Sequence, residues 1–156
     1  MREIRELRLW RGLDAPGLKL PQAGLNQVRH HVALAHGLAV QAIRAHGRAG
    51  TKVGPAENIA ACLPAIDTPA NVRAAEIATR ELNAGFLNVI LEGKYTDAFL
   101  EYAGANAPKY TPDELKIISS PNDFVGLNIY APNTTWSRPI GRQDSPFCLF
   151  LRRFRI

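Results

Sequence analysis

A long amphipathic pattern is the feature that most constrains the fold of this chain. Apolar side chains recur in alternating steps of three and four, which is the spacing of one helix face. The pattern predicts a helix of about 22 residues over 25–46 that ends near Gly47. The face expected to be buried consists of Leu25, Val28, Val32, Ala35, Ala39, Ala42 and Ile43.

Shorter patterns follow this helix along the chain. Apolar runs bounded by turn residues predict strands at 52–58 and 123–130. Between them, capping residues predict helices at about 68–83, 96–104 and 111–119, two of them with proline at the first helical position. Because helices separate the two strands, this order predicts an α/β fold with parallel strands and crossover helices.

The second strand pattern, DFVGLNIYAP, ends in two side chains that form hydrogen bonds. Alternate strand residues share a face, so Gly126, Asn128 and Tyr130 point one way and the apolar residues between them point the other. We expect this strand to be buried. A phenol and an amide on one face of a strand end can position a carboxylate or a sugar hydroxyl, or they can satisfy loop carbonyls.

Charge and hydropathy constrain the class of protein. The net charge is +5, but residues 1–21 carry five basic and three acidic groups, residues 138–156 five and one, and residues 22–137 nine and ten. Terminal basic groups can bind phosphate without specificity, and the chain shows no aromatic stacking platform, so nucleic acid is not the expected partner. No run of about 18 apolar residues occurs, and we expect a cytoplasmic protein with no membrane contact.

Cysteine and histidine spacing does not predict a metal site. Cys62 and Cys148 lack the spacing of metal ligands and are expected to be ordinary thiols. On a helix, His31 and His36 lie some 140° apart, whereas metal-binding pairs converge at i and i+4. We expect the histidines of residues 30–46 to take part in helix packing, and we expect no cofactor.

Six segments follow one another in a specific order along the chain. They are APGLK at 15–19, HHVALAHGLAVQAIR at 30–44, KVGPAEN at 52–58, DTPANVRAA at 67–75, LEGKYTDAFLEYAG at 91–104 and DELKIISSPNDFVGLNIY at 113–130. This series, over about residues 14–132, resembles glycoside hydrolase family 1, the β-glucosidase family.

The resemblance implies part of a (β/α)8 TIM barrel, with residues 52–58 as its fifth strand and 123–130 as its sixth. Active sites of such barrels lie at the carboxyl ends of the strands. Asn128 and Tyr130 match the family's Asn-x-Tyr, in which the tyrosine supports the catalytic nucleophile and the asparagine lines the sugar pocket. Asn58 matches an asparagine that follows the fifth strand near the aglycone.

The two catalytic glutamates of the family are not matched. They belong to Asn-Glu-Pro and Glu-Asn-Gly, and neither tripeptide occurs in these 156 residues. Asp14 stands where the family has a histidine. Glu57 and Glu92 are the carboxylates that remain as candidates for an acid or base role, and the resemblance gives neither a second acid opposite it.

The resemblance also predicts how the chain is divided. We expect a non-matching basic segment at 1–13, the barrel segment at 14–132, and a non-matching basic tail at 133–156 that is irregular. The chain would then be an internal piece of a β-glucosidase gene with unrelated or out-of-frame sequence at both ends. Two strands of an open barrel leave unpaired edges, so we expect self-association.

Three functions stay open at this point. The first is a β-glucosidase-type hydrolase that acts on a β-glucoside or another small saccharide, with the isolated chain inactive or weakly active. The second is a non-catalytic fragment that binds sugar weakly through Asn58, Asn128 and Tyr130. The third is a basic nucleic-acid-binding protein, which rests on the terminal charge alone.

Overall fold

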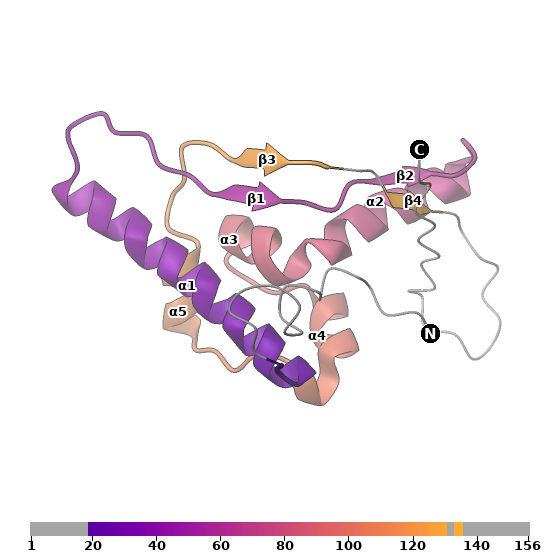
Figure 1. The fold of residues 1–156 in the computed structure, drawn as a ribbon, viewed down its shortest axis with the longest axis horizontal. Helices are drawn as coiled ribbons and strands as arrows, with labels where there is room; N and C mark the ends of the chain where they lie inside the picture. Colours follow the sequence, from indigo (N-terminus) through magenta and orange to yellow (C-terminus); the bar gives the residue numbers. More distant parts are fainter. Residues whose placement is uncertain (1–18, 131–132, 136–156) are drawn as a thin grey trace.

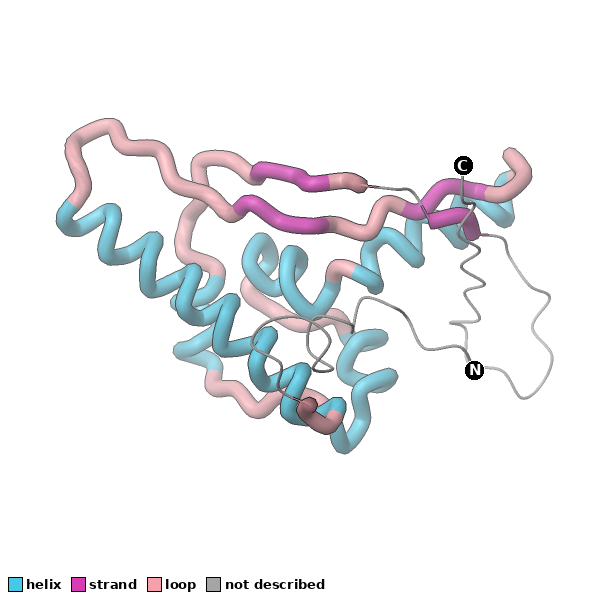
Figure 2. Tube along the Cα trace, in the orientation of Figure 1, coloured by secondary structure: helices cyan, strands magenta, loops and turns pink. Residues whose placement is uncertain are grey.

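The computed structural model describes residues 19–130 and 133–135, and it places a layer of helices against one side of two short strand pairs (Figure 1). Figure 2 shows the strands as one elongated band along the helices. The elements in chain order are α1 (Gln22–His46), β1 (Ala56–Asn58), β2 (Cys62–Pro64), α2 (Pro69–Leu82), the π-helix η2 (Ala84–Asn88), α3 (Val89–Glu92), α4 (Asp97–Ala103), the 3-10 helix η3 (Gly104–Asn106), α5 (Pro112–Ile118), β3 (Gly126–Asn128) and β4 (Asn133–Thr135).

Both strand pairs are parallel. β1 pairs with β3, with Ala56 opposite Gly126 and Asn58 opposite Asn128, and β2 pairs with β4. The helices α2 to α5 form the crossover between β1 and β3. The prediction of parallel strands joined by crossover helices is therefore confirmed. The prediction of an irregular tail is wrong at β4, because a strand of three residues is too short to show a period and forms through its partner β2.

The helix caps lie where the sequence predicts them. The side chains of Thr68 and Thr96 accept hydrogen bonds from the backbone N–H groups of Asn71 and Phe99. Thr111 and Glu114 form a complete capping box at the start of α5. Each cap satisfies backbone donors that the first helical turn leaves without partners, and this fixes where the crossover helices begin.

The buried face of α1 differs from the predicted one. Val32 and Ile43 of the predicted face are 43% and 37% exposed, and only Leu25 of that set is fully buried. The face that packs inward is interrupted by polar and small residues, which hides it from a pattern based on apolar side chains. Its other members are Asn26, His30, Ala33, Gly37 and Val40.

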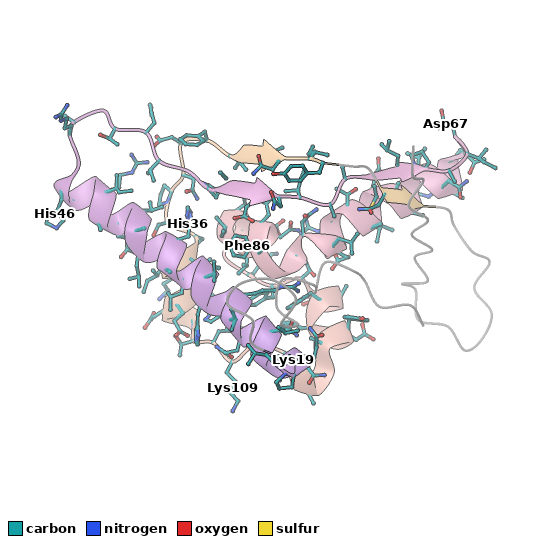
Figure 3. All side chains as sticks on the ribbon, in the orientation of Figure 1. Lys19, His36, His46, Asp67, Phe86 and Lys109 are labelled. Atoms are coloured by element: carbon teal, nitrogen blue, oxygen red, sulfur yellow. The ribbon has the colours of Figure 1, made fainter. Side chains whose placement is uncertain are left out.

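Gly37 explains why α1 turns this face inward. A Cβ atom at this position would lie 2.1 Å from the carbonyl oxygen of Ile117 in α5, so the two backbones meet directly. The core then forms from the side chains around this contact, and Phe86, labelled in Figure 3, packs against it. The buried cluster contains Ala33, Val89, Ile90, Tyr95 and Ile118.

The expectation of a buried strand at 123–130 is also wrong. The strand covers only Gly126–Asn128, and Leu127 and Ile129 are each 52% exposed. Within the described residues each sheet has two strands, so no further strand flanks β3 on its outer edge. Apolar composition predicts what a strand can bury, but the neighbours that would cover it are not among these residues.

His30 is a buried polar group in the core. Its side chain is fully buried, its Nδ1 lies 2.9 Å from the Tyr95 hydroxyl, and its Nε2 has no hydrogen-bond partner among the described residues. The nearest charge is Glu114, whose Oε2 is 3.7 Å from Nε2. Burial lowers the pKa of His30 below its ordinary value of 6.5, and Glu114 offsets part of this effect.

We predict that Gly37→Ala lowers the free energy of unfolding by about 2–3 kcal/mol, because the added methyl group forces α1 away from α5. Gly24→Ala on the same helix is the control, since its Cβ atom would make only ordinary van der Waals contacts, 3.4 Å from Leu20 Cβ and 3.5 Å from Pro21 Cδ. Alanine favours a helix over glycine by about 1 kcal/mol, so this control should be neutral or stabilising. Urea denaturation of both variants measures the difference, and equal effects would contradict the contact.

We also predict that His30 makes the stability depend on pH. Because its pKa is lowered in the folded state, the unfolded chain binds the proton more readily, and the free energy of unfolding falls as the pH drops through 6.5. His30→Gln should reduce this slope between pH 7 and 5, whereas His46→Gln at the exposed end of α1 should leave it unchanged. Denaturation curves at several pH values measure the slope, and an unchanged slope in His30→Gln would exclude this role.

Candidate functional site

Two asparagines lie side by side at the carboxyl ends of the paired strands. Asn58 of β1 is directly opposite Asn128 of β3, and the Ile59 N–H donates to the Asn128 carbonyl oxygen at 3.1 Å. Residues opposite each other in a parallel pair point to the same face, and both asparagines are exposed. The structure therefore brings together two of the residues that the sequence singled out.

Tyr130 follows two residues after Asn128. It lies in a bend beyond the end of β3 and is 85% exposed, so its placement on the asparagine face stays a prediction. The residues beneath the asparagines on this face, Ala56 and Gly126, are small, and a Cβ at Gly126 would lie 3.4 Å from Ala56 Cβ. The face thus carries two amide side chains above two small residues, and Tyr130 follows two positions later in the chain.

Glu57 lies on the opposite face of β1. Residues 53 and 55 are buried and residues 57 and 59 half-buried, while 56 and 58 are exposed, so the odd-numbered side chains face the helices. Burial raises the pKa of Glu57 above its ordinary value of 4.5. Its carboxylate is thus separated from Asn58 by the strand itself, and its candidate role as an acid stays a prediction.

Glu92 is held in an ion pair with Arg80. Two nitrogen–oxygen distances of 2.8 Å join the guanidinium of α2 to the carboxylate of α3. The hydrogen bond from Arg80 lowers the pKa of Glu92. This ion pair joins α3 to α2, and the candidate role of Glu92 as an acid or base stays a prediction.

Residues outside the predicted set hold the start of the strands. Asp123 accepts a hydrogen bond from the Val53 N–H at 2.8 Å, and its own N–H donates to the Val53 carbonyl at 2.7 Å. Arg44 of α1 donates to the same carboxylate at 2.6 Å. The hydrogen bond from Val53, followed by that from Arg44, lowers the pKa of Asp123. No spacing rule predicts this arrangement, because its members are far apart in the sequence.

A groove of about 450 Å³ lies between α2 and the segment that leaves β1. Ile59 and Cys62 form its wall on the strand side, and Val72, Glu76 and Thr79 form its wall on α2. Ile59 directly follows Asn58, so the groove begins where β1 ends. Among the described residues there is no cluster of three potential metal ligands, and none of the helices is long and apolar enough to cross a membrane.

Comparison with known proteins identifies the family. The sequence model described as glycosyl hydrolase family 1 matches residues 4–145. The chain belongs to this family. The match confirms the resemblance expected from the six segments and is wider than the range 14–132 that they cover. The division into the segments 1–13, 14–132 and 133–156 stays a prediction.

Two of the curated relatives are β-glucosidases of greater length. The chain is 36% identical over 121 residues to a β-glucosidase of Agrobacterium sp. (strain ATCC 21400), covering 78% of this chain and 26% of the relative. It is 32% identical over 134 residues to β-glucosidase 1B of Phanerodontia chrysosporium, covering 79% and 25%. The chain therefore spans about a quarter of the length of these relatives.

Solved structures give the same result. β-Glucosidase 2 from Trichoderma reesei matches with a TM-score of 0.73 and 27% identity, over 94% of this chain and 33% of that protein. The virulence factor SghA in complex with the substrate analogue salicin matches with a TM-score of 0.69 and 31% identity, over 86% and 29%. The matched β-glucosidases have the TIM barrel fold, and the present chain corresponds to part of it.

Proposed function

We propose that this chain carries one wall of a β-glucosidase pocket and binds a β-glucoside or another small saccharide through Asn58, Asn128 and Tyr130. The observation that carries the proposal is the parallel register, which sets Asn58 directly beside Asn128. An asparagine amide offers both donors and an acceptor, so a pair can hold adjacent hydroxyl groups of a sugar ring. The match to SghA with bound salicin supports a glucoside as ligand.

Tyr130 has a separate role in this proposal. By the family's Asn-x-Tyr motif, its hydroxyl would donate a hydrogen bond to the carboxylate that attacks the sugar. Such a bond stabilises the ionised nucleophile and fixes its orientation. In the present chain the phenol is 85% exposed, so it is available to a group outside the described residues.

Cleavage of the glucoside needs groups that these strands do not supply. A retaining glycosidase uses two carboxyl groups about 5–5.5 Å apart, one as acid and one as nucleophile. The described strand residues on the asparagine face are Ala56, Asn58, Gly126 and Asn128, and none is acidic. We infer that the described strands belong to an incomplete barrel and that the isolated chain is a weak sugar binder, inactive or weakly active as a hydrolase.

We also propose that the protein is cytoplasmic.

We predict that Asn128→Ala and Tyr130→Phe differ in their effects on sugar binding. Asn128→Ala should weaken binding of methyl β-glucoside about tenfold, because losing a hydrogen bond to a polar ligand costs about 1–1.5 kcal/mol. Tyr130→Phe should change binding little, since it keeps the aromatic ring that would contact the sugar and removes only the hydroxyl assigned to the nucleophile. Glu57→Gln should leave binding unchanged because Glu57 faces the helices. NMR titration measures the three affinities, and hydrolysis of a chromogenic β-glucoside measures activity. Unchanged affinity in Asn128→Ala would exclude the proposed pocket.

We also propose that copies of this chain associate through the strands. Within the described residues, β1 and β3 form a pair with no third strand, and Leu127 and Ile129 are half exposed. An open edge with apolar side chains is a template for pairing with another chain. The basic groups of residues 138–156 lie outside the described residues, and that a nucleic-acid partner is unlikely stays a prediction.

We predict that the chain forms oligomers or aggregates at micromolar concentration. Leu127→Lys should reduce this association, because a charge on a strand edge opposes pairing. Ile77→Lys is the control, since Ile77 is 57% exposed on α2, close to the 52% of Leu127. Light scattering measures the mass, and a monodisperse monomer for the unmodified chain would disprove the association.

A further inference from the structure

The segment that follows Asn58 is hydrogen-bonded on both sides. On one side it meets β3 and β4: the Ile59 N–H donates to Asn128, and the Asn133 N–H donates to the Ala61 carbonyl at 2.8 Å. In extended backbone, successive residues direct their polar groups to opposite edges. Ala60 and Cys62 therefore face the other edge, where α2 lies.

Side chains of α2 occupy this other edge. The Ala60 N–H donates to Asn83 Oδ1 at 3.0 Å, and Asn83 Nδ2 donates to the Ala60 carbonyl at 3.0 Å. A single side-chain amide thus forms both hydrogen bonds that a neighbouring strand would offer to Ala60. Two residues farther on, the Cys62 N–H donates to Thr79 Oγ1 at 3.0 Å.

Asn83 is itself held in place. Its Nδ2 also donates to the Thr79 carbonyl at 2.6 Å, and its backbone carbonyl accepts from the N–H groups of Phe86 and Asn88 in η2. The side chain therefore sits at a fixed junction between the end of α2 and the π-helix. A half-buried amide with each of its three hydrogen bonds at 3.0 Å or less has little freedom to move.

We propose that Asn83 and Thr79 are positioning residues for Asn58. They take the place of a strand beside Ala60 and Cys62, so the backbone is fixed on both edges immediately after Asn58. The direction in which Asn58 presents its amide, and its distance from Asn128, then depend on these two side chains. This inference rests on the proposed sugar site, and it adds two residues from the helix layer to the determinants of that site.

A positioning role for Asn83 and Thr79 differs measurably from a role in stability alone. If the two side chains served only the packing of α2, their loss would lower stability without changing the Asn58 amide. Asn71 offers the comparison: it is buried on the same helix and donates to the Ile66 carbonyl at 3.0 Å, at the opposite end from Asn83. Thr79→Ser retains the hydroxyl acceptor for Cys62, whereas Thr79→Val removes it and keeps the shape.

The test uses the full chain and three measurements on each of Asn83→Ala, Thr79→Val, Thr79→Ser and Asn71→Ala. Hydrogen exchange measures protection of the Ala60 and Cys62 amides. The side-chain amide signals of Asn58 and Asn128 report their surroundings. Titration with methyl β-glucoside measures binding.

We expect Asn83→Ala to speed exchange at Ala60, and Thr79→Val at Cys62, by about tenfold, the factor that corresponds to about 1.4 kcal/mol. Both should shift the Asn58 side-chain signal and weaken glucoside binding severalfold. Thr79→Ser and Asn71→Ala should keep the signal and the affinity of the unmodified chain.

Two results would overturn the inference. An unchanged Asn58 signal in Asn83→Ala would show that the amide does not position it, and equal losses of affinity in Asn71→Ala and Asn83→Ala would assign the effect to stability. If the unmodified chain did not bind methyl β-glucoside, that result would instead refute the proposed function and, with it, any role of Asn83 and Thr79 in sugar binding. Exchange at Ala60 and the Asn58 signal would still decide whether Asn83 orders the strand end.

Discussion

The parallel pairing of β1 with β3 is the interaction on which the rest of this structure depends. Parallel strands cannot be joined by a tight turn, so the chain between Asn58 and Gly126 must cross over, and it does so as the helices α2 to α5. The pair is short, with three residues in each strand. Hydrogen bonds at both ends therefore help to hold the two strands in register: those of Arg44 and Asp123 precede the pair, and that of Asn83 follows it.

The parts of the fold that the sequence predicted are those governed by local chemistry. Capping threonines and helix-starting prolines act within one turn, so Thr68, Thr96 and Thr111 mark helix starts without knowledge of the tertiary structure. The prediction of the buried face of α1 was wrong because that face is determined by contacts with α5 and Tyr95, which are distant in the sequence. Gly37 admits the backbone of α5, and His30 finds the Tyr95 hydroxyl, so a glycine and a histidine turn inward in place of Val32 and Ile43.

The candidate site divides in the same way. Asn58, Asn128 and Tyr130 could be predicted because a resemblance in sequence order carried them, and the strand register then set two of them side by side. Asn83 and Thr79 could not be predicted. A side-chain amide that replaces a strand leaves no period in the sequence, and its partner lies 23 residues away. The opposite orientations of Glu57 and Asn58 follow from alternation, but which side faces the helices emerges only from the assembled layer.

The close approach of α1 to α5 at Gly37 has a mechanical consequence for the strands. Because the backbones of α1 and α5 are in direct contact at Gly37, no change of side-chain rotamer can alter the distance between the two helices there. Arg44 lies in the last turn of α1, and Asp123 follows shortly after the end of α5. The geometry of their ion pair therefore depends on a backbone contact two helical turns away. Substitutions on the outer faces of both helices should then leave the strand register unchanged.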